Sequence, residues 1–469
     1  MKKVELLVKN AVIVTMDSGR RILQHAALAV DQGSIIALGD SLELEKKYAG
    51  THTVDAKNKI IFPGLINTHD HLFQMLLKGL AKDIPLVEWL DASVRPAIAH
   101  IGPEEIYLAA KVGLMEQLAS GTTTCVDYQY AHGKLGLDEA VLQAMDDIGI
   151  RGVLAKGYAN TANFPATCSC EFNETEDNFF ASARELHERY KDHPRLAIAM
   201  APGIIYDFSK DAFIKMRELA DETGMRITMH TVETKDDNIY ALEKYGMREF
   251  PFFESIGVLG GDFLAVHCVD VDEEDLRLFA KYDIQVSYNP LSNMIMGYDV
   301  TPIVEMRKKG INVSLALDGA ASNDNQNMLE VLKATALLQK CHHRNPAVMT
   351  AAEVLEMATL GGARAIGLAD EIGSLEVGKK ADFFLFNPIH LNSVPIADPI
   401  SALIYTGCEH NIEMTVVEGK VVYEQGECPG IVKEEILYAL QKAGSSIRAK
   451  AGLGNEQWGQ WLSLGEFEN

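Results

Sequence analysis

The sequence predicts an α/β protein in which a closed (β/α)₈ barrel lies between the two halves of a small β domain. The central part of the chain contains eight short apolar segments, and stretches with helical periodicity follow most of them over about 320 residues. Strand-like segments also occur before Pro63 and after Ala381. We therefore expect both chain ends to build one small domain, with the barrel inserted between them.

The N-terminal segment alternates polar and apolar residues, which is typical of half-buried strands. We expect strands over Glu5–Met16, Ala27–Leu38 and Thr51–Phe62, because turn-forming residues such as Asp, Asn and Gly separate them. Charged residues after Met1 interrupt the apolar run that a secretory signal peptide needs.

Continuous apolar runs, typical of parallel strands covered on both faces, mark the barrel. The eight predicted strands are 65–71, 122–127, 152–157, 196–201, 226–230, 263–267, 284–288 and 312–318. Helical patterns include 104–120, 210–223, 273–282 and 300–309.

The strand rhythm returns near the C-terminus, over 381–386, 413–417 and 420–423, and an amphipathic helix is predicted over 433–449. We expect a small β domain made of residues 1–62 and 383–430. Residues 63–382 form the barrel, and residues 431–469 form a C-terminal helical segment.

The composition excludes several classes of partner. The chain has 469 residues and a formal charge of −23, so its surface repels phosphate backbones and anionic lipid. No apolar run approaches the roughly 18 residues that span a bilayer. Seven cysteines are scattered, and we expect Cys168 and Cys170 to be loop thiols. The chain is expected to be cytoplasmic, with neither nucleic-acid nor membrane partners.

His69 and His71 close the first predicted barrel strand with one residue between them. Because strand side chains alternate between faces, both imidazoles point into the lumen at the C-terminal end of the strand. His230, His267 and Asp318 end the fifth, sixth and eighth predicted strands. Any one of them alone is as easily an ordinary core residue, but their convergence on one rim predicts a metal site.

We predict one divalent metal ion, held by histidines and the carboxylate of Asp318. Zinc or ferrous iron suits such ligands, and zinc is preferred. Zinc lowers the pKa of a bound water to about 7, so that hydroxide is available at neutral pH. His267 either ligates the metal or orients the water from beside it.

The remaining groups predict proton transfer. Asp318 can accept a proton from the water, and Glu233, three residues beyond His230, can move a proton to a substrate nitrogen. Such a step typically contributes about 10²–10⁴-fold in rate. A second metal often needs a bridging lysine, and the fourth predicted strand has none. Lys156, on the third strand, is expected to be structural or to face the substrate.

Together these motifs resemble the amidohydrolase superfamily, in its branch of aminohydrolases that act on nitrogen heterocycles. The motifs that carry the resemblance are Pro63–His71, Gly121–Thr124, His230–Glu233, Val266–Cys268, Asn289–Asn293, Asp318–Asn323 and Gly373–Asp382. The resemblance implies a distorted (β/α)₈ TIM barrel with a small composite β-sandwich domain. It also implies His69, His71, His230 and Asp318 as metal ligands, with Glu233, His267 and Asp318 catalytic.

Within that branch, the chain is similar to S-adenosylhomocysteine and methylthioadenosine deaminases around residues 81–90. Three matched positions differ, because those deaminases carry a glutamate at Ile98, a histidine at Gly203 and usually a lysine at Ile295. An apolar Ile98 cannot hydrogen-bond a ribose diol, and a buried polar group without a partner costs about 1–3 kcal/mol.

Other positions resemble 8-oxoguanine deaminases and triazine hydrolases, notably Gln74 in a His-x-His-x-x-Gln motif and the segment Met296–Tyr298. We expect Gln74 to read the edge of a substrate ring, and Trp89 and Tyr298 to supply its walls. Trp89 is equally well interpreted as a core anchor. Asn323 is also assigned to substrate binding.

The sequence therefore predicts a metal-dependent deaminase, a hydrolase acting on carbon–nitrogen bonds of cyclic amidines, in which metal-bound hydroxide attacks and ammonia leaves. The favoured substrate is a free N-heterocycle: an oxopurine, pterin, pyrimidine or s-triazine. One alternative is a nucleoside deaminase of the S-adenosylhomocysteine/methylthioadenosine type. Another is a triazine-type hydrolase that displaces chloride or an alkylamine. A non-catalytic assembly protein should have lost ligands, and none is missing. The resemblance also implies a homo-oligomer, a dimer or larger.

Overall fold

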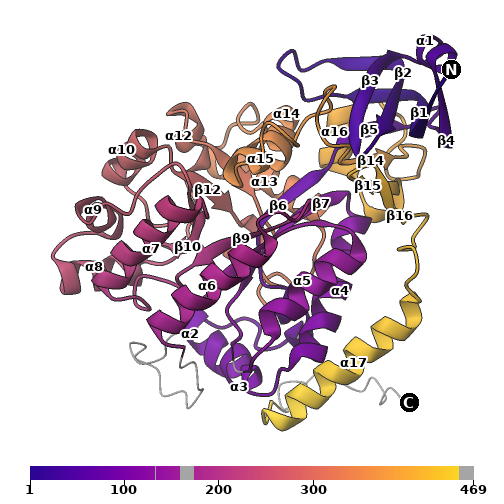
Figure 1. The fold of residues 1–469 in the computed structure, drawn as a ribbon. Coiled ribbons are helices and arrows are strands. Elements are labelled where there is room, and N and C mark those ends of the chain that lie inside the picture. Colours follow the sequence, from indigo (N-terminus) through magenta and orange to yellow (C-terminus); the bar gives the residue numbers. More distant parts are fainter. Residues whose placement is uncertain (133, 159–173, 454–469) are drawn as a thin grey trace.

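The computed structural model describes residues 1–132, 134–158 and 174–453, so Cys168 and Cys170 lie outside the described residues. It contains two eight-stranded sheets, a parallel barrel and a mixed sheet beside it (Figure 1). The predicted α/β fold, a distorted barrel with an additional β domain, is confirmed. No helix among the described residues is long and apolar enough to span a membrane.

The barrel strands pair in chain order, each parallel to the next. They are β6 (Leu65–Asp70), β7 (Thr122–Gln129), β8 (Arg151–Gly157), β9 (Leu196–Ala201), β10 (Ile227–Thr231), β11 (Phe263–His267), β12 (Gln285–Tyr288) and β13 (Val313–Leu315). First and last strand meet where the backbone N–H of Asp318 donates to the carbonyl of His69 (3.1 Å). Two candidate ligands therefore close the barrel.

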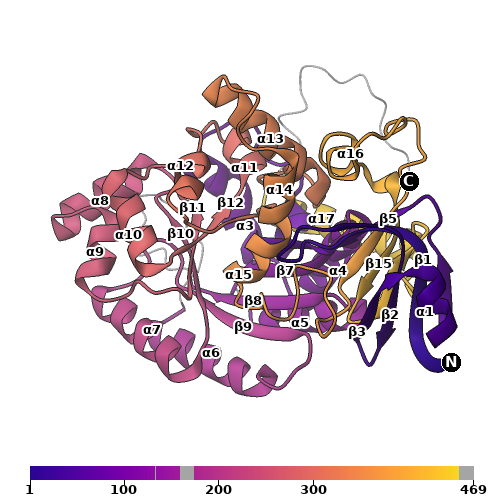
Figure 2. The ribbon, with the colours of Figure 1, turned by 90° about the horizontal axis from the view of Figure 1, so that it is seen from above.

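Helices surround the barrel, as Figure 2 shows for α6, α7, α9 and α10. They are α2 (Leu86–Trp89), α3 (Arg95–Ile98), α4 (Pro103–Ala119), α5 (Leu137–Ile148), α6 (Glu176–Tyr190), α7 (Lys210–Thr223), α8 (Lys235–Tyr245), α9 (Glu249–Ser255), α10 (Glu273–Tyr282), α11 (Pro290–Ile295), α12 (Ile303–Lys308), α13 (Met328–His343), α14 (Ala351–Glu356) and α15 (Gly362–Ala365). The 3₁₀ turn η1 (Leu72–Leu77) follows β6, and the π-helical turn η2 (Leu90–Val94) joins α2 to α3.

Local sequence sets the ends of these helices. Helix α7 begins where the Ser209 hydroxyl accepts from the N–H of Ala212 (3.1 Å), and it ends at Gly224, whose φ of 75° suits a residue without Cβ. Helix α8 begins with a capping box in which Thr234 and Asp237 satisfy each other's backbone N–H groups. Asp237 is therefore fixed at the rim of the barrel.

The second sheet takes strands from both chain ends, in the order β16-β15-β14-β5-β1-β2-β3, with β4 paired to β1. Its strands are β1 (Lys2–Val14), β2 (Ile22–Asp31), β3 (Ser34–Asp40), β4 (Tyr48–Asp55), β5 (Ile60–Pro63), β14 (Phe383–Phe386), β15 (Ile412–Val417) and β16 (Lys420–Glu424). Side chains from β1, β2, β14 and β15 share one buried cluster, so the sheet curves around its own core.

The remaining helices are α1 (Ser41–Lys47), α16 (Pro399–Thr406) and α17 (Lys433–Lys450). Helix α17 runs along the outside of α4 (Figure 1), where Ile447 is fully buried. We propose residues 63 and 382 as the domain boundaries, because the N–H of Gly64 donates to the carbonyl of Asp382 (3.0 Å) at the crossing between domains.

Several predicted segments differ from the observed elements. Residues 27–38 form a hairpin instead of one strand, because the Asp31–Gly33 turn separates β2 from β3. Residues 51–62 divide into β4 and β5, which both pair with β1. The last barrel strand is shorter than 312–318, and the helix predicted over 300–309 is confined to α12.

Candidate active site

A cavity of about 880 Å³ opens at the C-terminal end of the barrel strands, the end at which barrel enzymes carry their active sites. Five of its lining residues come from strand ends or directly follow them: His71, Tyr128, His230, His267 and Asp318. Other walls come from α2, η2 and α3, from the segment after β9, and from α8 and the turn after α11. The predicted rim residues thus share one cavity.

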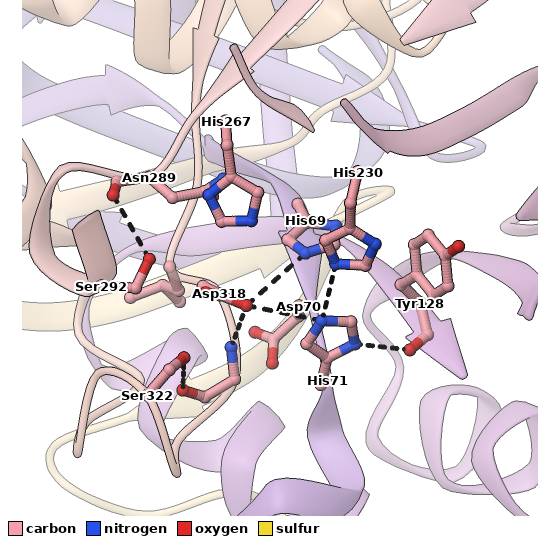
Figure 3. Close-up of polar contacts among 12 residues, drawn as sticks. His69, Asp70, His71, Tyr128, His230, His267, Asn289, Ser292, Asp318 and Ser322 are labelled. Carbon is pink, nitrogen blue, oxygen red and sulfur yellow. Dashed lines mark hydrogen bonds and ion pairs between the residues drawn. The ribbon is translucent and has the colours of Figure 1, made fainter. Parts of the chain in front are cut away.

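The predicted ligands form one cluster (Figure 3). Ligand atoms of His69, His71 and His230 lie within 4.8 Å of one another, and so do those of His69, His267 and Asp318. His69 belongs to both groups and is fully buried. The side chains that sequence spacing placed on one rim are therefore close enough to share an ion.

The protonation of His71 indicates that a cation fits this cluster. Its Nδ1 lies 2.7 Å from the carbonyl oxygen of Tyr128 and so carries the proton, which leaves a lone pair on Nε2. That Nε2 lies 3.2 Å from Nε2 of His230. Neither ring nitrogen of His69 has a hydrogen-bond partner among the described residues. Converging nitrogen lone pairs and one carboxylate are the donor set that zinc prefers.

Burial keeps the imidazoles neutral. It lowers the pKa of His69, lowers that of His71 to about 3, and lowers that of His230 well below the usual value. Neighbouring histidines add to the effect at His71 and His230. Metal ligation requires neutral imidazole, so the folded chain holds these side chains in the required state.

Asp318 lies between the histidines, with Oδ1 3.5 Å from Nε2 of both His69 and His71. Burial alone would raise the pKa of Asp318, but contact with His69 and the nearby His267 and His71 hold it well below its usual range. The N–H of Gly319 also donates to Oδ1 (2.8 Å). Asp318 has a φ of 62°, a left-handed conformation that costs a residue with a Cβ about 1–3 kcal/mol. Such strain is typical of functional sites.

His267 is also left-handed, with a φ of 70°. Its Nδ1 lies 2.9 Å from Oδ1 of Asn293, an acceptor, so Nδ1 carries the proton and the lone pair is on Nε2. This Nε2 lies 3.8 Å from Oε1 of Glu233. The geometry thus links His267 both to the ligand cluster and to Glu233.

Glu233 faces the same cavity from the loop after β10. The hydroxyl of Tyr298 donates to its Oε1 (3.0 Å), and burial raises the pKa of Glu233 above its usual value. A carboxyl group with a raised pKa can hold a proton near neutral pH and release it to a base.

The backbone before Glu233 is clamped. Val232 has a φ of 40°, which is strained for a β-branched residue. Its N–H donates to Oε2 of Glu249 (3.1 Å), and its carbonyl accepts from the N–H groups of Val269 (3.0 Å) and Asp270 (2.9 Å). Glu249 is fully buried, and burial raises its pKa well above the usual range. These contacts hold the peptide that presents Glu233 to the cavity.

Three predicted substrate residues line the cavity, but two have other partners. The amide of Gln74 donates to the hydroxyl of Tyr130 (3.0 Å) and accepts from the N–H of Ala321 (3.2 Å), so both of its ends are engaged within the protein. Tyr298 is bonded to Glu233. Trp89 is a cavity wall, and no described residue accepts from its buried Nε1.

Asn323 is not among the residues that line the cavity. Its amide donates to the carbonyls of Leu317 (3.0 Å) and Asn325 (3.3 Å), so it stabilises the loop after β13. Its assignment to substrate binding is thus not supported by its contacts. Lys156 pairs with both oxygens of Glu174 (2.9 Å) and is also absent from the lining, which agrees with a structural role.

Two positions that differ from nucleoside deaminases have distinct surroundings. Ile98 is buried in the main core and does not line the cavity. Gly203 does line it, with a φ of 93°. A Cβ there would lie 2.1 Å from Oδ2 of Asp207, so a histidine would not fit this backbone. The N–H and carbonyl of Gly203 instead hold the hydroxyl of Tyr128 (2.6 and 3.0 Å).

The sequence prediction missed part of the site. Tyr128 and Tyr130 line the cavity from the end of β7, beyond the strand predicted to stop at Asp127. Their i, i+2 spacing could have indicated that both face the lumen. It also missed an acidic wall, formed by Glu88, Asp207, Asp236, Asp237 and Glu243. Arg95 is the one lysine or arginine lining the cavity among described residues, and it pairs with Asp91.

Known proteins share the whole arrangement. The sequence pattern described as "Amidohydrolase family" matches residues 60–422. A 5-methylthioadenosine/S-adenosylhomocysteine deaminase from Nitratidesulfovibrio vulgaris is 33% identical over 94% of this chain and 96% of its own length. A structure of an adenosine deaminase from Xanthomonas campestris with bound zinc has a TM-score of 0.90 and 28% identity, covering 96% of this chain and 99% of that one. Atrazine chlorohydrolase TrzN from Arthrobacter aurescens TC1, in complex with zinc and atraton, has a TM-score of 0.87 and 26% identity, covering 94% and 100%.

Proposed function

This chain belongs to the amidohydrolase family, and we propose that it is a metal-dependent hydrolase that releases ammonia from an amino-substituted nitrogen heterocycle. The observation that carries the proposal is the cluster of His69, His71, His230 and Asp318 beside Glu233 in one cavity. Deaminases and a triazine hydrolase share the fold over nearly the whole chain.

His69, His71, His230 and Asp318 would hold one divalent ion, and zinc is favoured because zinc-bound structures are similar to this chain. When bound, such an ion supplies a Lewis acid that makes water nucleophilic at neutral pH. His267 is placed to orient the attacking water through Nε2, whose lone pair faces the cavity side of Glu233.

The chain's own acids and bases would move the protons. Asp318, which is held as a carboxylate, can accept the proton of the attacking water. Glu233, whose pKa burial raises, can protonate the ring nitrogen next to the carbon under attack. The amino group then leaves as ammonia when a proton reaches it. This division follows from the opposite pKa shifts of the two carboxyl groups.

The acidic wall restricts the substrate's charge. Five carboxyl groups line the outer cavity, and Arg95 already pairs with Asp91. A phosphate in this cavity would meet repulsion without a free cation to bind it. We therefore propose a substrate without phosphate.

Two substrate sizes are each favoured by a specific observation. A volume of about 880 Å³ is ample for a nucleoside, in agreement with the nucleoside deaminases that the chain resembles. A free heterocycle is favoured by Ile98, which is buried in the core and offers no group to bind a ribose diol at that position. Gln74 and Tyr130 then lie where the ring edge would be read.

An ammonia-release screen of the metal-loaded protein tests the proposal. Candidate substrates are 5′-methylthioadenosine, S-adenosylhomocysteine, adenosine, AMP, oxopurines, pterins, pyrimidines and aminotriazines, with chloride and alkylamine release measured in parallel. We expect deamination of a neutral amino-heterocycle, no reaction with AMP, and loss of activity after chelation that zinc restores. Protein that folds but retains no stoichiometric metal would contradict the proposal.

A further inference from the structure

A second cavity, of about 330 Å³, lies at the opposite end of the barrel, where the strands begin. Lumen-facing side chains of five consecutive strands, β7 to β11, line it: Val126, Val153, Ala197, Ala199, Thr228 and Leu264. The segment at and after α15 forms the other wall through Ala365, Ile366 and Leu368. It lies outside the proposed active site and shares no lining residue with it.

The cavity lies one layer of side chains below the active site. Thr228 precedes His230 by two residues on β10, so both side chains point into the lumen. Ala197 is exposed, although the other residues of β9 are buried. Since Ala197 faces the same lumen as Ala199 and Ala201, its exposure shows that the barrel is open to solvent at this point.

Cationic side chains surround the opening. Each of the adjacent strands β8, β9 and β10 starts at or directly after an arginine, namely Arg151, Arg195 and Arg226. All three line the cavity, together with Lys191, His187 and His193, and Glu371 is the one carboxylate in the lining. This local excess of positive charge stands out in a chain with a net charge of −23.

Two of these arginines are neutralised within the protein. Arg151 pairs with Asp382 (2.8 Å), and Arg195 pairs with Asp146. Arg226 has no ion pair within the described ranges. Its Nη2 donates to the carbonyl of Gly261 (2.8 Å), while its buried Nε lacks an acceptor there. A guanidinium that is partly desolvated without a counter-ion favours binding of an anion.

A second polar atom in the cavity is also unpartnered. The hydroxyl of Thr228 is 98% buried by exposure of its residue (2% exposed) and has no hydrogen-bond partner among the residues described. The surfaces around it are apolar, from Val153, Ala199 and Ile366. The cavity thus combines a cationic entrance with an apolar interior and one free hydroxyl.

We propose that this cavity binds a small carboxylate with an apolar body. The carboxylate pairs with Arg226 at the entrance, and the apolar body lies against the lumen wall of β8 and β9 and against Ile366. A volume of about 330 Å³ is at the lower end of the range for small-molecule sites and accommodates a single ring. The site is independent of the substrate of the active site.

Calorimetric titration of the metal-loaded full chain with benzoate tests this, with benzamide as the neutral probe of equal size. We expect saturable binding of benzoate that is at least about tenfold tighter than that of benzamide. Arg226→Met should weaken benzoate binding by about tenfold or more, which corresponds to roughly 1.4 kcal/mol. Arg184→Met is the matched control, because Arg184 pairs with Glu222 on the surface and does not line the cavity.

A second variant keeps the proposal falsifiable if Arg226→Met does not fold. Ala197→Phe fills the opening from an exposed position and should abolish benzoate binding while metal content and deaminase activity persist. Unchanged affinity in either variant would place benzoate elsewhere, for example at the metal, and would overturn the proposal. Equal affinities for benzoate and benzamide, or binding of inorganic phosphate without binding of benzoate, would also overturn it.

Discussion

The hydroxyl of Tyr298 donates a hydrogen bond to Oε1 of Glu233 across 3.0 Å, from the turn after α11 to the loop after β10. Tyr298 was expected to be an apolar wall for the substrate ring. Its hydroxyl instead fixes the carboxyl group that we propose as the proton donor. A neutral hydrogen bond of this kind contributes about 0.5–1.5 kcal/mol.

Tyr298→Phe should therefore lower kcat by roughly three- to tenfold, because Glu233 loses its orientation while the aromatic wall is retained. KM should change little. Steady-state kinetics of the variant, alone and combined with Glu233→Gln, measure this effect. If the tyrosine acts through Glu233, its substitution should cost nothing further in the Glu233→Gln background.

Glu233→Gln should keep its metal and lose turnover by at least about a hundredfold, because an amide cannot transfer the proton. Metal analysis and kcat of the same preparation separate the two effects. Glu243→Gln is a useful control, since it removes an exposed carboxylate from the outer part of the same cavity. Normal turnover in Glu233→Gln would remove this residue from the mechanism.

Asp318→Asn should reduce turnover by more than about a hundredfold, because an amide is a weaker ligand and cannot accept the proton of water. Its fold should persist, since the backbone N–H that bonds His69 is retained. Activity and circular dichroism of the variant measure the two outcomes. Full activity would show that another base serves.

Glu249→Ala should lower kcat by about tenfold with unchanged metal content, because the N–H of Val232 loses its acceptor and the peptide before Glu233 can relax. Glu249→Gln retains an acceptor oxygen and should restore most of the activity. A loss of kcat without a matching rise in KM distinguishes positioning from general destabilisation. Equal kinetics in the Ala and Gln variants would contradict this role.

Burial raises the pKa of Asp127 to about 7, although its Oδ1 accepts from the N–H of Leu72 (2.7 Å). The folded state therefore holds this proton more tightly than the unfolded state does. Stability from this group is full below about pH 4 and is lost as pH rises through about 7. Asp127→Asn should accordingly show a smaller fall in Tm between pH 5 and pH 9 than the parent chain. A pH dependence identical to that of the parent would show that Asp127 does not ionise in this range.

Strand geometry accounts for what could be predicted of the site. His69 and His71 share a lumen face because of the two-residue repeat, and His230, His267 and Asp318 follow because parallel strands end on one rim. Those rules give the position of a Cα and the face of a strand. They do not give the left-handed backbone of His267 and Asp318, which results from tertiary contacts.

Side-chain partners from distant elements could not be predicted. Gln74 looked free to bind a ring, but Tyr130 and Ala321 come from β7 and from the loop after β13 to engage its amide. Asn323 differs for the opposite reason, since its partners lie within its own loop. The hairpin over residues 27–38 escaped prediction because apolar residues continue on both sides of the turn.

The shared sheet of the small domain has a consequence for synthesis on the ribosome. Strand β5 pairs with β14, which is translated about 320 residues later, so β5 emerges long before its neighbour exists. At about 5–20 residues per second, that interval lasts roughly 15–60 s. Throughout it, one edge of the N-terminal strands is open to other nascent chains, and a chaperone that covers strand edges should raise the yield of native protein.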